Sequence, residues 1–375
     1  MTQRASRLDW VDGLRALAAL WVIAYDLWIF NWQPDMGLLT PLFRSGHLGV
    51  EVFMVLSGFC LFWPLSKFQS LEPGTWRRFF VRRTKRILPP YYVAILYTLL
   101  LPYFLLPFAS ILPMPTVPPL PTPWNLGAHL LLIHNLFPEI RSGINPSFWS
   151  LSLEAQFYVI FPLLALAILR LGIPGIFLVL GANLLYRGAA LALFPAGGPI
   201  LMSLLTAIPA RLPIFFLGML AAWVIRRGGV PRLPRWLEHA WGLSIPGLIA
   251  AGFWFYYHPI GIWPMSDLLI GVAIASTLVR FSNGAGWLAS LVELPPLVWL
   301  GEISYSFYLI DRPTCYYVTY AVRTFIHGSN VAMLWLSLLF GVALSLFLAV
   351  YFHRFFEKPF MVRKEPRSLP QAVAA

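Results

Sequence analysis

The feature that most constrains this chain is a series of long apolar runs joined by short polar or basic segments. A helix needs about 20 apolar residues to cross the hydrocarbon core of a bilayer, so each run predicts a membrane-spanning helix. Only 11% of the 375 residues are charged, less than half the fraction in a typical soluble domain. The sequence therefore predicts an all-α, polytopic membrane protein. The runs are 14–32, 48–66, 90–112, 148–170, 175–194, 204–225, 242–257, 263–281, 303–322 and 332–353.

The basic segments predict how many of these runs cross the membrane. Segments 67–86, 226–235 and 354–364 are rich in Lys and Arg, and positive loops stay in the cytoplasm, so all three are expected on one side. Because segments 67–86 and 226–235 are expected on the same side, an even number of spans must separate them. Four runs lie between them. An eleventh run, 126–137, would make that number odd and would cover only about 18 Å as a helix. It is predicted to be re-entrant or interfacial, which leaves ten spans with both termini in the cytoplasm.

The net charge of +12 bears on the partner of the chain. A soluble protein this basic would suggest nucleic acid. Here the positive residues lie in loops between apolar runs, so the expected partner is the lipid bilayer of the cell (inner or plasma) membrane. The two cysteines lack CxxC spacing and no His/Cys cluster occurs, so neither a metal site nor a bound cofactor is predicted.

The chain carries no long soluble segment and no repeat that would divide it. We expect a single membrane domain over 1–375, with a core at about 8–362 and a disordered tail at 363–375. The six prolines of 113–123 predict an extended outer loop.

Residues 76–90 alternate basic and apolar positions, which predicts a basic helix at the inner membrane surface, stopped by Pro89 and Pro90. Its arginines have two interpretations. In the first, they anchor the chain to anionic lipid. In the second, they bind the phosphates of an anionic cytoplasmic donor, because the N–H groups of a guanidinium are spaced to donate to two phosphate oxygens.

Ionisable residues inside the runs are the first candidates for chemistry, because a charge in a span costs about 2.5–3.5 kcal/mol even on the lenient insertion scale. Asp26 lies eleven residues after Arg15 in the first run, so the two share a helix face about 16 Å apart. Glu154 stands among alternating serines and a glutamine, a polar cluster that predicts a cavity.

Asp311 precedes Pro313, and because adjacent side chains diverge on a helix it is expected to pair with another helix rather than with Arg312. His47, His134 and His353 are interpreted as interfacial residues rather than catalysts.

Seven segments occur in a fixed order: WVDGLRALAALWVIAYD, GHLGVEVFMVLSGF, FFVRRTKRILPPYY, WSLSLEAQFYVIFPLL, RLPIFFLGMLAAW, LGEISYSFYLIDRP and FEKPF. This order resembles the acyltransferase-3 family of membrane acyltransferases over roughly residues 8–362. The resemblance implies a ten-span core and transfer of an acyl group, commonly acetyl. The implied co-substrate is a coenzyme A thioester, and the implied acceptor is a hydroxyl of a sugar, polysaccharide or small natural product.

Two histidines of the family pattern are replaced in this chain. Asp26 occupies the position of the first-span His, and Asp311 occupies the position of the His in the family's YLIH. The second acid of the family's SVEEQFY is Ala155. Asp can accept a proton, but it is not a neutral donor and acceptor at pH 7 as imidazole is. The residues that the resemblance carries over by position are Arg15, Ser57, Arg82, Arg83, Arg86, Glu154 and Tyr305.

The leading hypothesis is an O-acyltransferase with Asp26, Glu154 and Asp311 as catalytic acids. Substrate would be bound by the other residues carried over, with the acyl-CoA donor at the basic helix. Two alternatives remain open. The three acids could form the relay of a proton- or cation-coupled transporter, or the chain could be a catalytically inactive protein that keeps the acyltransferase fold.

Overall fold

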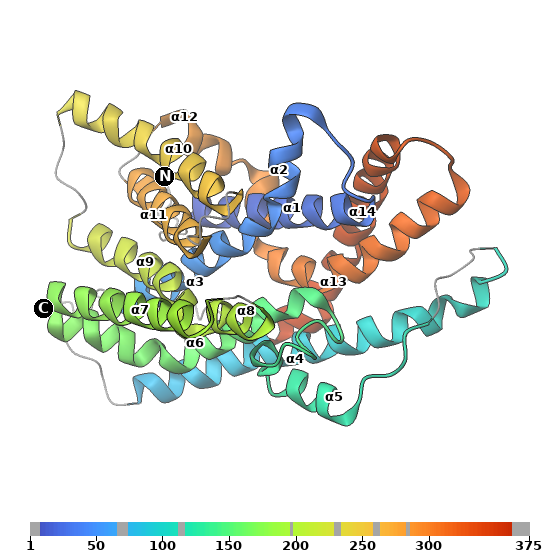
Figure 1. Ribbon diagram of the computed structural model, residues 1–375, viewed down its shortest axis with the longest axis horizontal. Coiled ribbons are helices and arrows are strands. Elements are labelled where there is room, and N and C mark those ends of the chain that lie inside the picture. The colour runs from blue at the N-terminus through green and yellow to red at the C-terminus, as the bar shows by residue number, and fades with distance from the viewer. Residues whose placement is uncertain are drawn as a thin grey trace, which may run out of the picture.

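A computed structural model describes residues 8–65, 74–111, 117–195, 198–228, 234–257, 263–282 and 286–361. Over these ranges the chain forms helices joined by turns and contains no strand, which confirms the all-α prediction (Figure 1). The predicted tail, 363–375, lies outside the described residues. Of the predicted outer loop, 117–122 is described and has no regular secondary structure.

Each predicted apolar run corresponds to a helix of 17 residues or more within the described ranges. Seven helical segments are both long and apolar enough to cross a membrane, which supports a polytopic membrane protein. They contain all of the long helices except α10, α11 and α13, so the count of ten crossings stays a prediction, as does the side on which each terminus lies. The long helices are α1 (Asp9–Phe30), α3 (Gly49–Leu65), α4 (Thr75–Leu105), α6 (Trp149–Leu166), α7 (Ile173–Leu193), α9 (Ile208–Arg226), α10 (Arg235–Tyr257), α11 (Trp263–Ser282), α13 (Pro295–Phe325) and α14 (Asn330–Phe352).

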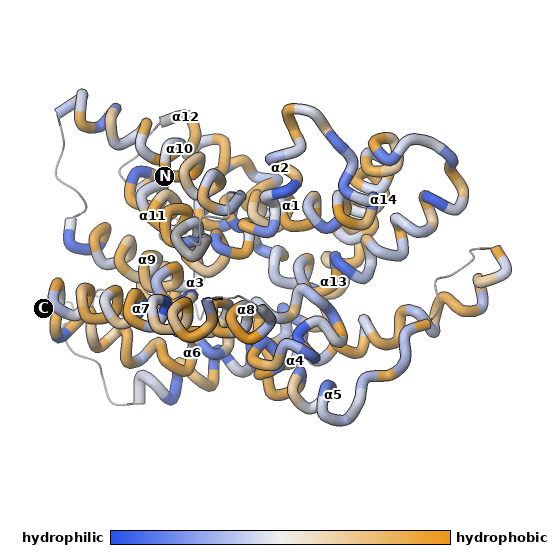
Figure 2. Tube along the Cα trace, viewed as in Figure 1, coloured by the Kyte–Doolittle hydropathy of each residue, from blue (hydrophilic) through white to orange (hydrophobic). Residues whose placement is uncertain are grey.

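The outer surface of this bundle is apolar. Figure 2 shows hydrophobic residues along nearly every helix, including the faces turned away from the centre. Large side chains such as Phe104, Leu185 and Leu193 are each more than 70% exposed. A surface of this kind is stable only where lipid replaces water, which is the arrangement expected of spanning helices.

Helices α1 and α3 lie in the interior, between α9, α10 and α11 on one side and α13 and α14 on the other (Figure 1). Small residues let their backbones approach their neighbours closely. A Cβ on Gly58 would lie 1.9 Å from the Phe215 carbonyl oxygen of α9, and a Cβ on Gly301 of α13 would lie 1.9 Å from the Asp12 carbonyl oxygen of α1. Glycines at such contacts are typical of helix pairs in membranes, where close packing replaces the hydrophobic effect.

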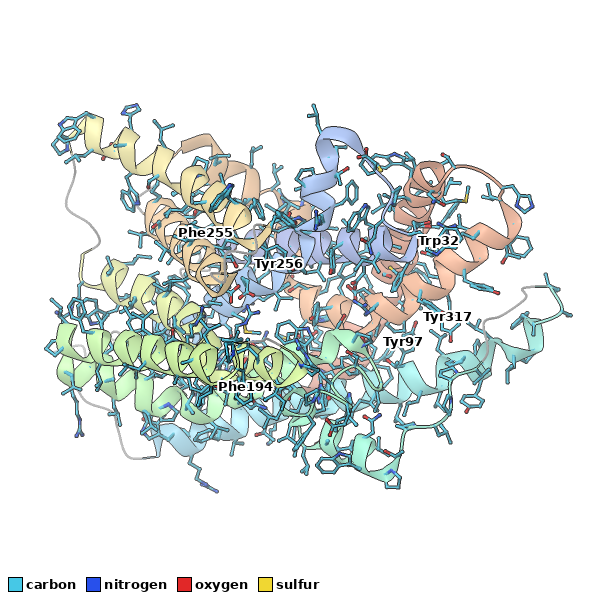
Figure 3. The ribbon with its side chains drawn as sticks, viewed as in Figure 1. Trp32, Tyr97, Phe194, Phe255, Tyr256 and Tyr317 are labelled. Atoms are coloured by element: carbon cyan, nitrogen blue, oxygen red, sulfur yellow. The ribbon has the colours of Figure 1, made fainter. Side chains whose placement is uncertain are left out.

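The prediction that Pro89 and Pro90 stop the basic helix was wrong. Helix α4 continues through both prolines from Thr75 to Leu105, so the basic segment and the third span form one helix. Hydrogen bonds to α13 hold α4 on either side of the two prolines. The Tyr305 hydroxyl of α13 donates to the Ile87 carbonyl at 3.1 Å. Further along, the hydroxyls of Tyr97 and Thr314 lie 2.7 Å apart where α4 meets α13 (Figure 3).

The eleventh run forms only the short helix α5 (Pro123–Leu130) and a 3-10 turn (His134–Leu136), so it does not span the membrane. It is tied to α6 by hydrogen bonds from Gln156 Nε2 to Asn135 Oδ1 at 2.7 Å and from Ser152 to the Leu132 carbonyl. His134 is fully buried in the protein, and its interpretation as an interfacial residue stays a prediction.

Candidate active site

A cavity of about 340 Å³ lies where α1, α3, α4, α6 and α13 meet. Its volume is at the lower end of the range for pockets that bind small molecules. Each of the five helices contributes polar side chains to a wall that is otherwise apolar. The polar lining residues are Arg15, Ser57, Cys60, Arg83, Arg86, Ser150, Glu154, Tyr158, Glu302, Ser304, Tyr305 and Tyr308.

The cavity gathers six of the nine residues that the sequence predicted for the site: Arg15, Ser57, Arg83, Arg86, Glu154 and Tyr305. Arg82 is exposed and is not among the lining residues, because it lies on another face of α4. Asp26 and Asp311 are buried, and they do not line the cavity either. The three acids expected to share one cavity are therefore not brought together.

Glu154 of α6 is the centre of the hydrogen bonding in the cavity. The Ser57 hydroxyl of α3 donates to Glu154 Oε1 at 2.8 Å. The Tyr158 hydroxyl, one turn further along α6, donates to the same oxygen at 2.6 Å. Two hydroxyl groups from two helices thus fix the orientation of one carboxylate inside the membrane bundle.

Guanidinium groups balance this carboxylate. Arg15 and Arg83 both interact electrostatically with Glu154. Arg15 Nη2 also lies 3.8 Å from the Cys60 sulfur, and the Arg83 Cζ atom lies 5.8 Å from the centre of the Tyr158 ring. With Arg86, three arginines face a cavity lined by two glutamates, so the wall favours an anionic ligand.

The cavity is elongated along α3. Its lining residues on that helix run from Val50 to Leu61, which at 1.5 Å per residue is about 16 Å. Arg15, Cys60 and Leu61 lie toward one end, and Val50 toward the other. A second cavity of about 200 Å³ adjoins the arginine end and shares Arg15 and Cys60 with the first. The cavity therefore has two ends of different character, with Ser57 and Glu154 between them.

Asp26 and Asp311 belong to a separate ionic cluster around Arg312. The Arg312 guanidinium pairs with Asp26 Oδ1 of α1, and the Arg312 backbone N–H donates to Asp311 Oδ1 at 2.6 Å. Sequence reasoning expected Asp311 to reach another helix. In the structure the Arg312 side chain does so, while Asp311 accepts from the backbone N–H of the next residue. Tyr308, one turn before Asp311 on α13, lines the cavity. The cluster and the cavity are therefore neighbours along this helix.

Sequence reasoning missed a second buried network. Arg211 of α9 pairs with Glu51 of α3 and, at 3.1 Å, with Asp267 of α11; Arg187 of α7 lies 3.9 Å from Asp267. The signal was present as the charged residues Arg187, Arg211 and Asp267 inside the runs 175–194, 204–225 and 263–281. It pointed to buried charge, but one sequence does not show which charges meet. This network joins four helices and does not line the cavity.

A third buried group lies at the end of α14. Glu357 is fully buried and accepts from the Ser306 hydroxyl at 2.6 Å, while His353 Nδ1 lies 2.9 Å from the same carboxylate. His353, which was interpreted as interfacial, is one partner of this group. Over the described ranges, no set of three His, Cys, Asp or Glu side chains is arranged to hold a metal ion.

Comparison with known proteins agrees with this architecture. The family model described as an acyltransferase domain matches residues 8–354. The peptidoglycan O-acetyltransferase OatA of Listeria monocytogenes is 28% identical over 93% of this chain and 55% of its own length. A putative peptidoglycan O-acetyltransferase of Bacillus subtilis is 26% identical over 96% of this chain and 55% of its own length.

The chain spans about half the length of these curated relatives, and no solved structure matches it. The family match, in contrast, covers nearly the whole chain and all five helices of the cavity. This chain belongs to the acyltransferase-3 family of membrane acyltransferases.

Proposed function

We propose that this protein transfers an acyl group, in the first place acetyl, from an acyl-CoA donor to a hydroxyl of a carbohydrate. The observation that carries the proposal is the Glu154 carboxylate, held by two hydroxyl groups inside a cavity of the membrane bundle. A positioned carboxylate is a suitable general base for a hydroxyl. The relatives named as peptidoglycan O-acetyltransferases support a polysaccharide acceptor.

The donor would enter at the arginine end of the cavity. Arg83 and Arg86 lie in α4, on the same helix as the other basic residues of the segment 76–90. Guanidinium groups bind phosphate oxygens through two parallel hydrogen bonds, which suits the phosphates of coenzyme A. In the predicted topology this end faces the cytoplasm, where acyl-CoA is present. Arg82, outside the cavity, is not needed for this role.

In the overall reaction the acyl carbon moves from the thioester sulfur to a hydroxyl oxygen. Glu154 takes the hydroxyl proton and returns it to the departing coenzyme A thiolate, so the proton balance closes. Arg15 and Arg83 face the same region and would stabilise negative charge that develops on the carbonyl oxygen. Tyr305, which lines the cavity while bonding to α4, would shape the acyl site.

Asp26 and Asp311 have a different place in this proposal. The ion pair of Asp26 with Arg312 fixes α1 against α13, two helices that carry Arg15 and Tyr305. A cation relay through all three acids receives less support, because Asp26 and Asp311 are not lining residues of the cavity that holds Glu154.

The proposal is tested with the full chain purified into lipid nanodiscs. Radiolabelled acetyl-CoA and peptidoglycan fragments or other carbohydrates are supplied, and coenzyme A release and acceptor labelling are measured. Glu154→Gln should slow transfer by roughly 100-fold or more, the usual contribution of a general base. Glu139→Gln, at an exposed acid outside the cavity, should leave the rate unchanged. Equal rates for Glu154→Gln and wild type, or no transfer by wild type to any acceptor, would overturn the proposal.

A further inference from the structure

The Ser57 hydroxyl occupies a position that the overall reaction alone does not require. It lines the cavity, and its hydrogen bond points at the carboxylate that acts as base. Tyr158 in turn holds that carboxylate at 2.6 Å. A nucleophile within hydrogen-bond reach of a base, with the base oriented by a third group, is the arrangement found in enzymes that form covalent intermediates.

We propose that Ser57 carries the acyl group as a covalent ester between donor and acceptor. This inference rests on the proposed function and specifies its route. In the first step Glu154 takes the Ser57 proton and Oγ bonds to the acyl carbon. The carbon–sulfur bond breaks, and coenzyme A leaves with the proton that Glu154 returns. In the second step the acceptor hydroxyl gives its proton to Glu154 and attacks the ester carbon, and Ser57 Oγ leaves and takes that proton back.

The size and shape of the cavity favour a reaction in two steps, in which the donor and the acceptor bind one after the other. A volume of about 340 Å³ suits one ligand at a time rather than an acyl-pantetheine arm and a sugar together. Ser57 lies between Val50 and Leu61, the limits of the cavity on α3. An ester there lets coenzyme A depart from the arginine end before the acceptor approaches from the other end.

The packing of α3 holds this serine in place. The next residue, Gly58, is pressed against the Phe215 carbonyl of α9, where a Cβ would lie 1.9 Å from the oxygen. Adjacent side chains on a helix do not face each other, so Gly58 packs against α9 while Ser57 reaches Glu154 of α6. A nucleophile fixed in this way loses little freedom when it reacts.

Cys60, one turn along α3, is the competing nucleophile in the same cavity. It contacts the Arg15 guanidinium at 3.8 Å, a weak contact for its sulfur. Ser57, in contrast, has the base within 2.8 Å. The geometry therefore assigns the acyl group to Ser57, and the experiment must separate the two residues.

Wild-type protein in nanodiscs is mixed with radiolabelled acetyl-CoA and no acceptor, then digested for mass spectrometry. We expect a burst of coenzyme A approaching one equivalent per protein and an acetyl group on Ser57. Ser57→Ala should abolish the burst, and Ser57→Cys should restore it as a hydroxylamine-sensitive thioester. Ser337→Ala, a buried serine of α14 outside the cavity, should keep the burst. Thermal unfolding of each variant shows whether it is folded.

Steady-state rates give an independent readout. Double-reciprocal plots for donor and acceptor should be parallel if coenzyme A leaves before the acceptor reacts. Intersecting lines, an acetyl group on Cys60, or a full burst in Ser57→Ala would overturn the serine ester while the wild type still transfers acetyl, so the proposed function would stand. If wild-type protein neither releases coenzyme A nor labels any acceptor, the proposed function fails, and the ester fails with it.

Discussion

The Arg312 guanidinium of α13 pairs with the Asp26 carboxylate of α1, and the Asp26 side chain is 2% exposed. These two helices share the most extensive helix–helix contact in the described part of the chain. The pair stands where the family pattern has a histidine in the first span. In this chain the residue at that position, Asp26, joins α1 to α13. It does not line the cavity that holds Glu154.

Asp26→Asn should destabilise the protein strongly. Removing one partner leaves the partly buried Arg312 guanidinium without its ion pair to α1, and breaking a buried pair in this way costs up to about 3–5 kcal/mol. The double variant Asp26→Asn with Arg312→Gln removes both charges and should recover much of the loss. Thermal unfolding in one detergent measures both. A double variant as unstable as Asp26→Asn would show that the ion pair does not set stability here.

Asp311→Asn should behave differently from Asp26→Asn. Asp311 Oδ1 accepts from a backbone N–H, which an amide oxygen does equally well, and Oδ2 has no hydrogen-bond partner. Removing a buried charge without removing a hydrogen bond should leave stability unchanged or raise it by about 1 kcal/mol. Acetyl transfer should also continue. Loss of transfer in a folded Asp311→Asn protein would restore Asp311 to the catalytic role that the sequence suggested.

The parts of this structure that depend on local sequence were predictable. Apolar runs of span length became long helices because each run must satisfy its own backbone in lipid. Glu154 and Ser150 of the polar cluster line a cavity as predicted, whereas Ser152 and Gln156 bond to residues 132–135 instead. The proline pair in α4 did not stop the helix, and the local sequence does not show the contacts with α13 that hold α4 there, such as the bond from the Tyr305 hydroxyl to the Ile87 carbonyl.

The parts that depend on which helices meet were not predictable from one sequence. Asp26, Glu154 and Asp311 share a chemical type, but Arg312 takes two of them out of the cavity by reaching across to α1. The same holds for Arg211, whose two acidic partners come from α3 and α11. Residue type predicts that a buried charge has a partner, and only the packing decides which partner it has.

Arg83→Gln and Arg86→Gln should weaken donor binding. Each loses a guanidinium at the cavity wall, and a charge-assisted hydrogen bond contributes about 1.5–3 kcal/mol. The KM for acetyl-CoA should therefore rise roughly 10- to 100-fold, with a smaller change in kcat. Arg82→Gln changes the same residue type on the exposed side of α4 and should leave KM unchanged. A similar rise in all three variants would instead indicate general attraction by the basic helix.

The histidine pair of the segment 126–137 should make the fold sensitive to acid. The rings of His129 and His134 stack with their centres 3.8 Å apart, and both are fully buried. Burial, reinforced by the charge of the neighbouring histidine, lowers the pKa of His134 to about 3, below the ordinary value of 6.5. As the pH falls, the unfolded chain therefore binds a proton at His134 that the folded chain does not bind. Stability from this site is complete above about pH 6.5 and should fall steadily as the pH drops toward 3.

Replacing one ring tests this dependence. His134→Gln has no group that titrates in this range and removes one of the two stacked imidazoles. Its melting temperature should start lower than that of wild type at pH 8, because a buried ring is lost. It should then fall less between pH 7 and pH 5, so that the two curves converge. His239→Gln, at an exposed histidine of α10, should reproduce the wild-type slope. Parallel curves for His134→Gln and wild type would mean that acid acts elsewhere in the bundle.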